Sequence, residues 1–210
     1  MLKVYDCIAT AHDLKLVALA AFVCVLASIA AIKLLRYARK SAGRMRGVGL
    51  TVSAVSTGFG IWATHFIAML AFTPGIPSGY NIVLTILSLI VAILLTGVGL
   101  TVSLVDNWRP APWIGGAIVS GGIAAMHYMG MAAFDIAGVI VWDPALVVAS
   151  IVLGAMLGSV ALAVGFAVSA LLTLSGTQGF SSGVPACAVA ALSAGFTSAV
   201  AASEIGRAHV

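Results

Sequence analysis

The sequence has 210 residues, of which 62% are hydrophobic and only 8% are charged, whereas soluble domains carry about a quarter of charged residues. This composition excludes an ordinary water-soluble domain and indicates a chain whose main solvent is lipid. The net charge of +4 does not indicate a nucleic-acid partner, because six of the ten basic residues form one cluster typical of a cytoplasmic membrane-protein loop: Lys33, Arg36, Arg39, Lys40, Arg44 and Arg46.

Turn residues and charges divide the chain into about six predicted transmembrane helices, since a helix needs about 20 apolar residues to cross the hydrocarbon. The first covers about residues 14–36, and the basic cluster extends from its end into the following loop. The second covers about residues 48–72 and stops at a turn rich in proline and glycine, residues 73–79. The third covers about residues 81–105.

The fourth predicted helix covers about residues 113–134, and a loop with two acids and no bases follows it. The fifth and sixth cover about residues 145–174 and 184–203. Within the fifth, Gly154 and Gly158 have the small-residue spacing that lets helices pack closely. With the basic cluster inside the cell, the charge pattern predicts an N-terminus on the outside.

An internal repeat is the most informative feature of the sequence. Residues 60–72 (GIWATHFIAMLAF) align without gaps on residues 122–134 (GIAAMHYMGMAAF), with seven of thirteen positions identical and a shift of 62 residues. That shift accommodates one helical hairpin, so the predicted unit is a pair of helices duplicated in the same orientation. A third copy at the same shift would place a histidine near position 189, where the sequence has Val189.

We therefore predict one all-α polytopic membrane domain over residues 1–210, built from two-helix repeats at about 14–72 and about 81–134, with a degenerate third repeat at about 145–203. No segment between the helices is long enough to bury a core of its own, so no soluble output domain is predicted. The chain itself is not expected to be an enzyme. Any catalytic output is expected on another chain or beyond the end of this one.

Each copy of the repeat places a histidine and a methionine on one helix face. Residues i and i+4 are neighbours about 6 Å apart in a helix, which pairs His65 with Met69 and His127 with Met131. An intramembrane histidine is a candidate functional residue by default. A neutral imidazole beside a soft thioether favours copper, particularly Cu(I), over magnesium or calcium. Met126 lies about 100° round the helix from His127 and could reach the same site from its flank.

Two other functions are compatible with the same residues. Paired histidines on two helices also suit bis-histidine haem ligation, as in a membrane cytochrome or redox subunit. In a structural or transport protein, the histidines would instead be packing residues that find hydrogen-bond partners in the core.

The two motif copies carry a resemblance to a known family. The segments MHYMGMAA (126–133) and HFIAML (65–70), with the proline-rich turn after the earlier one, resemble the MHYT domain of bacterial integral membrane sensors. The resemblance implies three hairpin repeats in the cytoplasmic membrane, with the motifs toward its outer face.

For function, the resemblance implies a membrane sensory domain that binds copper and senses a diatomic gas such as oxygen, carbon monoxide or nitric oxide. It further implies signalling to a cytoplasmic domain that makes or degrades cyclic di-GMP, expected here on another chain or lost by truncation. The residues implied as metal ligands, by motif position, are His65, Met69, Met126, His127 and Met131.

Overall fold

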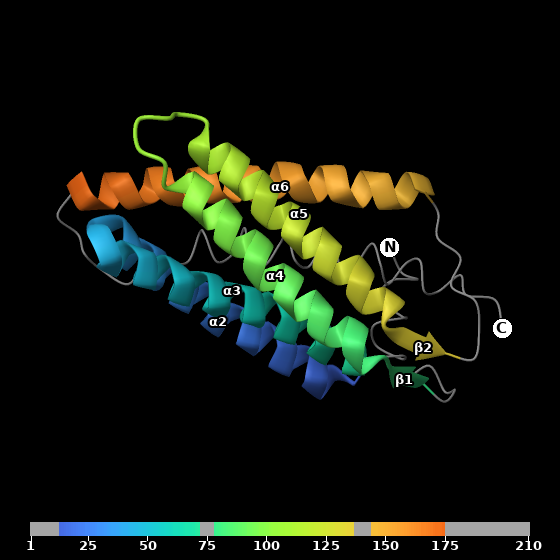
Figure 1. The fold of residues 1–210 in the computed structure, drawn as a ribbon. Helices are drawn as coiled ribbons and strands as arrows, with labels where there is room; N and C mark the ends of the chain where they lie inside the picture. The colour runs from blue at the N-terminus through green and yellow to red at the C-terminus, as the bar shows by residue number, and fades with distance from the viewer. Residues whose placement is uncertain (1–12, 72–77, 137–143, 175–210) are drawn as a thin grey trace.

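The computed structural model describes residues 13–71, 78–136 and 144–174 (Figure 1). These residues form five long helices and two short strands, in the order α2 (Leu14–Lys40), α3 (Gly43–Ala71), β1 (Ser78–Tyr80), α4 (Ile82–Ser103), α5 (Ala111–Ala132), β2 (Phe134–Ile136) and α6 (Pro144–Leu174). Each helix lies where the sequence predicts one. The predicted sixth transmembrane helix, at about residues 184–203, lies outside the described residues.

The predicted helical fold class is confirmed, and two strands of three residues each lie beside the helix ends. β1 and β2 pair antiparallel, with Ser78 opposite Ile136 and Tyr80 opposite Phe134. β1 leads into α4 and β2 follows α5, so the hairpin brings the two extended segments side by side. Their backbone groups then bond to each other. Strands of three residues are too short to show the alternation of apolar and polar residues by which a strand is predicted from sequence.

Four of the described helices, α2, α3, α4 and the described part of α6, are long and apolar enough to cross a membrane. The 22-residue helix α5 has the same length as α4 but is less apolar, because it contains glycines, His127 and Tyr128. The physical reason is its position: α5 lies between α4 and α6 (Figure 1). Much of its surface therefore contacts protein and not lipid.

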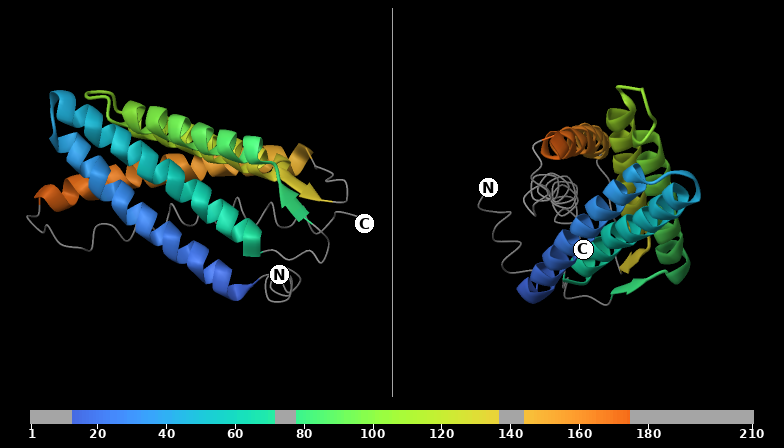
Figure 2. Two further views of the ribbon diagram at one scale, coloured as in Figure 1. Left: turned by 60° about the horizontal axis from the view of Figure 1, so that its bottom comes forward. Right: turned by 90° about the vertical axis from the view of Figure 1, so that its left-hand side faces the viewer.

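The helices follow one another in space as they do in the chain. Figure 2 shows the α2–α3 turn and the α4–α5 loop at one end of the bundle and the two strands at the other. At the first end, Arg46 of α3 forms an ion pair of 3.2 Å with Asp106 and donates a 2.6 Å hydrogen bond to the carbonyl of Leu104. These contacts join the first helical hairpin to the loop of the second.

The hairpins α2–α3 and α4–α5 use equivalent residues to close their ends near the strands. The backbone N–H of Asp13 donates to the carbonyl of Ala71 at 2.9 Å, and that of Asn81 donates to the carbonyl of Ala133 at 2.8 Å. Asp13 and Asn81 are the N-caps of α2 and α4. The alanines are 62 residues apart and the caps 68 apart, because α4 and α5, with 22 residues each, are shorter than α2 and α3, with 27 and 29.

Glycines bring the helices into close contact at equivalent places. A Cβ added to Gly60 would lie 2.3 Å from the Cβ of Ala27, and one added to Gly122 would lie 2.7 Å from the Cβ of Leu95. These glycines occupy matching positions in the two copies of the motif. At the α5–α6 contact, a Cβ on Gly116 would lie 2.4 Å from the carbonyl oxygen of Gly158, one of the two glycines predicted to serve helix packing.

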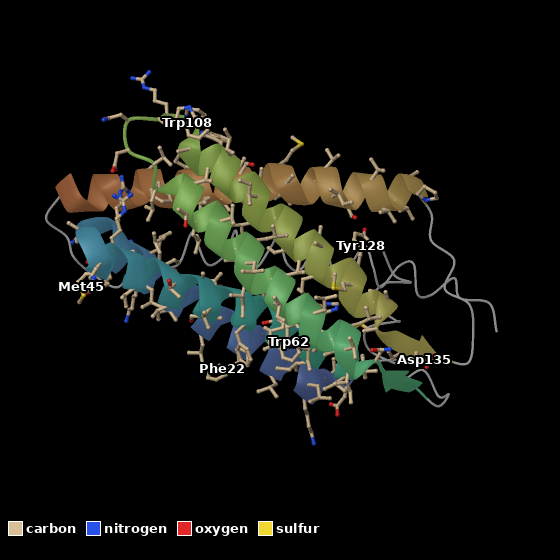
Figure 3. All side chains as sticks on the ribbon, in the orientation of Figure 1. Phe22, Met45, Trp62, Trp108, Tyr128 and Asp135 are labelled. Carbon is tan, nitrogen blue, oxygen red and sulfur yellow. The ribbon has the colours of Figure 1, made fainter. Side chains whose placement is uncertain are left out.

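Large apolar side chains cover the outer surface of the bundle. Phe22 points away from the other helices in Figure 3 and is 61% exposed. Leu94 and Met156, on α4 and α6, are exposed to a similar degree. In water such a surface would be an aggregation hazard, whereas in a bilayer it faces hydrocarbon.

Candidate functional site

The two repeated histidines lie near the strand end of the bundle, one on α3 and one on α5. His65 precedes the last residue of α3, Ala71, by six positions, and His127 precedes the last residue of α5, Ala132, by five. A helix rises 1.5 Å per residue, so both imidazoles lie roughly 8–9 Å inside the helix ends. The duplication therefore delivers two histidines to the same depth.

The imidazoles of His65 and His127 touch. Their Nδ1 atoms are 3.3 Å apart, and their ring centroids are 4.9 Å apart with the planes at 72°. Both side chains are buried, with exposures of 7% and 6%. The two hairpins pack together mainly through α3 and α4, and the histidine pair is one of the few contacts between α3 and α5.

The pair leaves two nitrogen atoms without partners. A hydrogen bond between the Nδ1 atoms requires one ring to donate and the other to accept, and the two neutral imidazoles then have opposite tautomers. Among the described residues, the Nε2 atoms of His65 and His127 are both buried without a hydrogen-bond partner. Each such orphaned group costs about 1–3 kcal/mol. Buried polar atoms without hydrogen-bond partners are often found at functional sites.

Gly130 supplies the space for one of the rings. A Cβ at this position would lie 2.7 Å from Nε2 and 3.1 Å from Cδ2 of His65. Gly130 is three residues after His127, one helical turn along α5. The second copy of the motif therefore contributes its own histidine and, at Gly130, the space that the imidazole of His65 occupies.

The methionines four residues after the histidines also meet. Met69 (8% exposed) and Met131 (1% exposed) form one buried cluster with Phe134, and Tyr80 packs against it. The ring of Phe66 connects the histidines to this cluster, because its centroid lies 5.2 Å from that of His65 and 5.9 Å from that of Tyr80. Two thioethers and an aromatic layer thus lie between the histidine pair and the strand end of the bundle.

Met126, the remaining predicted ligand, is also buried, at 1% exposure. It lies on α5 one residue before His127. The structure therefore brings His65 together with His127, and Met69 together with Met131. For Met126 it shows burial beside the pair, and its role as a ligand stays a prediction.

Tyr128 connects the site to α6. Its ring centroid lies 5.2 Å from that of His127, and its hydroxyl is 2.5 Å from the Oγ of Ser150. Ser150 in turn donates to the carbonyl of Val147 at 2.8 Å. Figure 3 shows Tyr128 beside α6. A change in the position of His127 would therefore alter the contact between Tyr128 and α6.

The donor set and its spacing fit a small soft metal ion. Metal–imidazole bonds are about 2.0 Å long, so two nitrogens at adjacent corners of a tetrahedron are about 3.3 Å apart. The two Nδ1 atoms have that separation, 3.3 Å. In the described part of the chain, no group of three or more His, Cys, Asp or Glu side chains could hold a metal. Thioethers would have to complete the set, and thioethers favour Cu(I).

The same geometry does not suit haem. Bis-histidine ligation places the two imidazoles on opposite faces of a wide macrocycle. Here the rings of His65 and His127 touch each other, and the backbone of Gly130 lies against His65. A porphyrin between them would require α3 and α5 to separate. The spacing favours an ion over a macrocycle.

Sequence reasoning missed three contributors to the site. Gly130, Tyr80 and Ser150 were not singled out, although each contacts a motif residue or its cluster. Gly130 could have been found from the alignment, since it replaces Ala68 at the matching position. No local signal marks Tyr80, in β1, or Ser150, on α6, because both reach the site only through tertiary packing.

Comparison with known proteins gives the class of this chain. Residues 58–116 and 121–207 match the family model described as MHYT, bacterial signalling protein N-terminal repeat. Each matched segment begins a few residues before one of the two histidines. The chain belongs to this family, as the motif resemblance predicted.

Curated relatives are much longer proteins. An uncharacterized signaling protein of Caulobacter vibrioides is 41% identical over 175 residues, which are 83% of this chain and 20% of the relative. The bifunctional diguanylate cyclase/cyclic di-GMP phosphodiesterase MucR of Pseudomonas aeruginosa is 35% identical over 75% of this chain and 23% of its own length. The cyclic di-GMP phosphodiesterase NbdA of the same organism is 35% identical over 66% of this chain and 18% of its own length.

This chain therefore spans about a fifth of the length of the curated relatives that it matches. No solved structure matches it. Together, the family and the four long apolar helices identify a multi-pass membrane signalling domain of the kind found in cyclic di-GMP turnover proteins.

Proposed function

We propose that this domain is a sensory input module of the bacterial cytoplasmic membrane, in which His65, His127 and the nearby methionines bind copper and detect a diatomic gas. The observation that carries the proposal is the buried histidine pair, whose Nδ1 atoms are 3.3 Å apart, the separation of two ligands of one metal ion. Copper held there would supply an open coordination position for oxygen, carbon monoxide or nitric oxide.

The charge distribution supports a site near the outer face. At the end with the α2–α3 turn, the described residues include seven basic side chains and one acidic one, whereas at the strand end they include Lys15, Asp13 and Asp135. The positive-inside rule places the first end in the cytoplasm. The histidines then lie toward the outside and α2 begins there, with the N-terminus on the outer side.

The residues around the site restrict what reaches it. The layer of Met69, Met131, Phe134 and Tyr80 is apolar and separates the imidazoles from the outer end of the bundle. A small apolar gas passes such a layer more easily than a hydrated ion does, because the ion would lose its hydration shell. The layer thereby favours gas access to a metal that is already bound.

Helix packing provides a route for the signal. His127 contacts both His65 on α3 and Tyr128 on its own helix, and Tyr128 bonds to Ser150 of α6. A ligand that changes the position of His127 would favour one packing of α5 against α6 over another. Such a bias between two arrangements is sufficient to transmit a signal across the bilayer.

The output follows from the relatives. MucR and NbdA are named for making or degrading cyclic di-GMP, and each is about four to six times as long as the region it shares with this chain. We infer that this domain controls a cytoplasmic cyclic di-GMP cyclase or phosphodiesterase. That partner lies on another chain or in a longer form of this one.

Copper stoichiometry tests the proposal. The detergent-purified chain is loaded anaerobically with Cu(I), freed of excess metal and analysed by plasma mass spectrometry and absorption spectroscopy. We expect near-stoichiometric copper in the wild type and its loss in the His65→Ala/His127→Ala variant. Met45→Leu serves as a control, because Met45 is exposed at the opposite end of the bundle (Figure 3) and its change should leave copper binding intact.

The alternatives predict different results in the same experiment. A haem protein would show a Soret band that disappears with His127→Ala. A structural or transport protein would hold neither metal nor chromophore, and a wild-type protein free of copper after loading would refute the proposed sensor.

A further inference from the structure

The cytoplasmic end of the first hairpin carries a dense positive charge. The last turn of α2 contains Arg39 and Lys40, and the first turn of α3 contains basic residues and no acidic one. Only residues 41 and 42 separate the two helices, so these side chains emerge from neighbouring helix ends. Lys33, Lys40 and Arg44 are exposed.

The described residues supply little negative charge to balance this cluster. The sequence has no Asp or Glu between Asp13 and Asp106. Asp106 pairs with Arg46, and Arg39 lies over the ring of Phe166, 4.8 Å from its centroid. Asp13 and Asp135 lie at the opposite end of the bundle. In the described part of the chain, the basic side chains at this turn therefore outnumber the acidic ones, which favours a negative partner from outside the chain.

The depth of the cluster indicates what that partner is. Helix α2 has 27 residues and is therefore about 40 Å long, about 10 Å more than the hydrocarbon core of a bilayer. If α2 enters the hydrocarbon near Leu14, Lys33 lies close to the inner boundary and the basic residues after it lie among the lipid headgroups. Phosphodiester groups occupy that depth on the cytoplasmic leaflet.

We propose that the α2–α3 turn is a binding site for anionic phospholipid headgroups of the inner leaflet, formed by Lys33, Lys40 and Arg44 together with their basic neighbours. The site is separate from the histidine pair and does not depend on copper. The second hairpin offers no equivalent, because its loop, residues 104–110, carries Arg109 and Asp106. Bound lipid would anchor the first hairpin while the second remains free to move against it.

Lipid retention by the full chain tests this site. Protein purified in a neutral detergent is mixed with phosphatidylglycerol or phosphatidylcholine at equal mole fractions, and bound lipids are counted by native mass spectrometry. We expect the wild type to retain phosphatidylglycerol at least tenfold better. Each basic residue near an anionic surface contributes about fivefold, so Lys33→Gln/Lys40→Gln/Arg44→Gln should weaken retention on the order of 100-fold.

Lys15→Gln is the matched control, because Lys15 is an exposed lysine at the opposite end of α2 and its change should have no effect. Circular dichroism checks that the triple variant is helical. If it is not, salt titration of the wild type replaces it, since headgroup binding must weaken between 50 and 500 mM NaCl, concentrations spanning Debye lengths of about 14 to 4 Å.

Three results would overturn the proposal. Equal retention of both lipids would show that the charge of the headgroup is not recognised. Retention unchanged by the triple substitution or by salt would place any lipid elsewhere on the bundle. Displacement of phosphatidylglycerol by millimolar glycerol phosphate would indicate a site for a soluble anion. None of these results bears on copper binding, so this inference can fail without the sensor proposal.

Discussion

The hairpins α2–α3 and α4–α5 share a framework but differ in what they contribute to the site. Both close with an N-cap residue bonded to an alanine at the end of the second helix, and both pack through a glycine five residues before the histidine. Around the histidines the symmetry ends. The first copy has Ala68 where the second has Gly130, and Phe66 where the second has Tyr128.

These two differences make the contacts between the repeats asymmetric. Gly130 receives the imidazole of His65, so the second hairpin holds the first. The aromatic residue after each histidine contacts the following repeat: Phe66 meets Tyr80, just before α4, and Tyr128 meets Ser150 of α6. The first connection is between apolar rings, whereas the second is a hydrogen bond. Substitutions at Gly130, at the two helix caps and at Tyr128 test how the two hairpins differ.

The largest effect is expected from Gly130→Ala. The added methyl would lie 2.7 Å from Nε2 of His65, and overpacking of this kind costs about 1–3 kcal/mol. The imidazole would have to move, so copper binding should weaken together with stability. Thermal unfolding and copper stoichiometry measure the two effects.

Gly121→Ala provides the control for that substitution. Gly121 belongs to the same helix, and a Cβ there would have nothing within 4 Å, so the change should be neutral or slightly stabilising, as expected for alanine in a helix. If the Gly130→Ala variant had the same thermal stability and copper content as the Gly121→Ala variant, the space at Gly130 would have no role in the site.

The helix caps should differ by a smaller amount. The Asn81 side chain accepts from the N–H groups of both Val83 and Leu84, at 3.0 and 3.2 Å, whereas Asp13 accepts from that of Lys15 at 2.9 Å. Loss of a cap costs about 1 kcal/mol. We expect Asn81→Ala to destabilise the domain by about that amount and Asp13→Ala by less, measured by chemical denaturation in detergent. The reverse order would show that the charge of Asp13 outweighs the second bond of Asn81.

The smallest effect on stability is expected from Tyr128→Phe. Hydrogen bonds between membrane helices contribute about 0.6 kcal/mol, so removal of the bond to Ser150 should lower stability only slightly. Its effect on signalling should be larger, because Phe would make this position resemble Phe66. In a chain joined to a cyclic di-GMP output domain, copper should still bind while the response to the gas is lost.

A double-mutant cycle isolates the Tyr128 bond. Ser150→Ala alone and combined with Tyr128→Phe should show coupling near 0.6 kcal/mol, and Tyr37→Phe, at a half-exposed tyrosine of α2, should behave like wild type. Additive effects of the two site substitutions would mean that the bond does not couple α5 to α6.

The class of protein, the positions of the described helices and the histidine motif could all be predicted from the sequence. Helix positions follow from the length and composition of apolar segments, because lipid requires every backbone group to bond within its own segment. The spacing of His65 from Met69, and of His127 from Met131, follows from the geometry of one helix. These are local properties, and local properties can be calculated from neighbouring residues.

Which residues of different helices come into contact depends on the tertiary structure. Four contacts of the site and its surroundings join segments from different helices or repeats. They are the 3.3 Å contact between the Nδ1 atoms, the contact of Gly130 with His65, the bond from Tyr128 to Ser150 and the pairing of β1 with β2. Their geometry depends on the crossing and depth of whole helices, which are set by many small packing contacts acting together. No window of the sequence contains both partners of such a contact, so its distance could only be found in the folded chain.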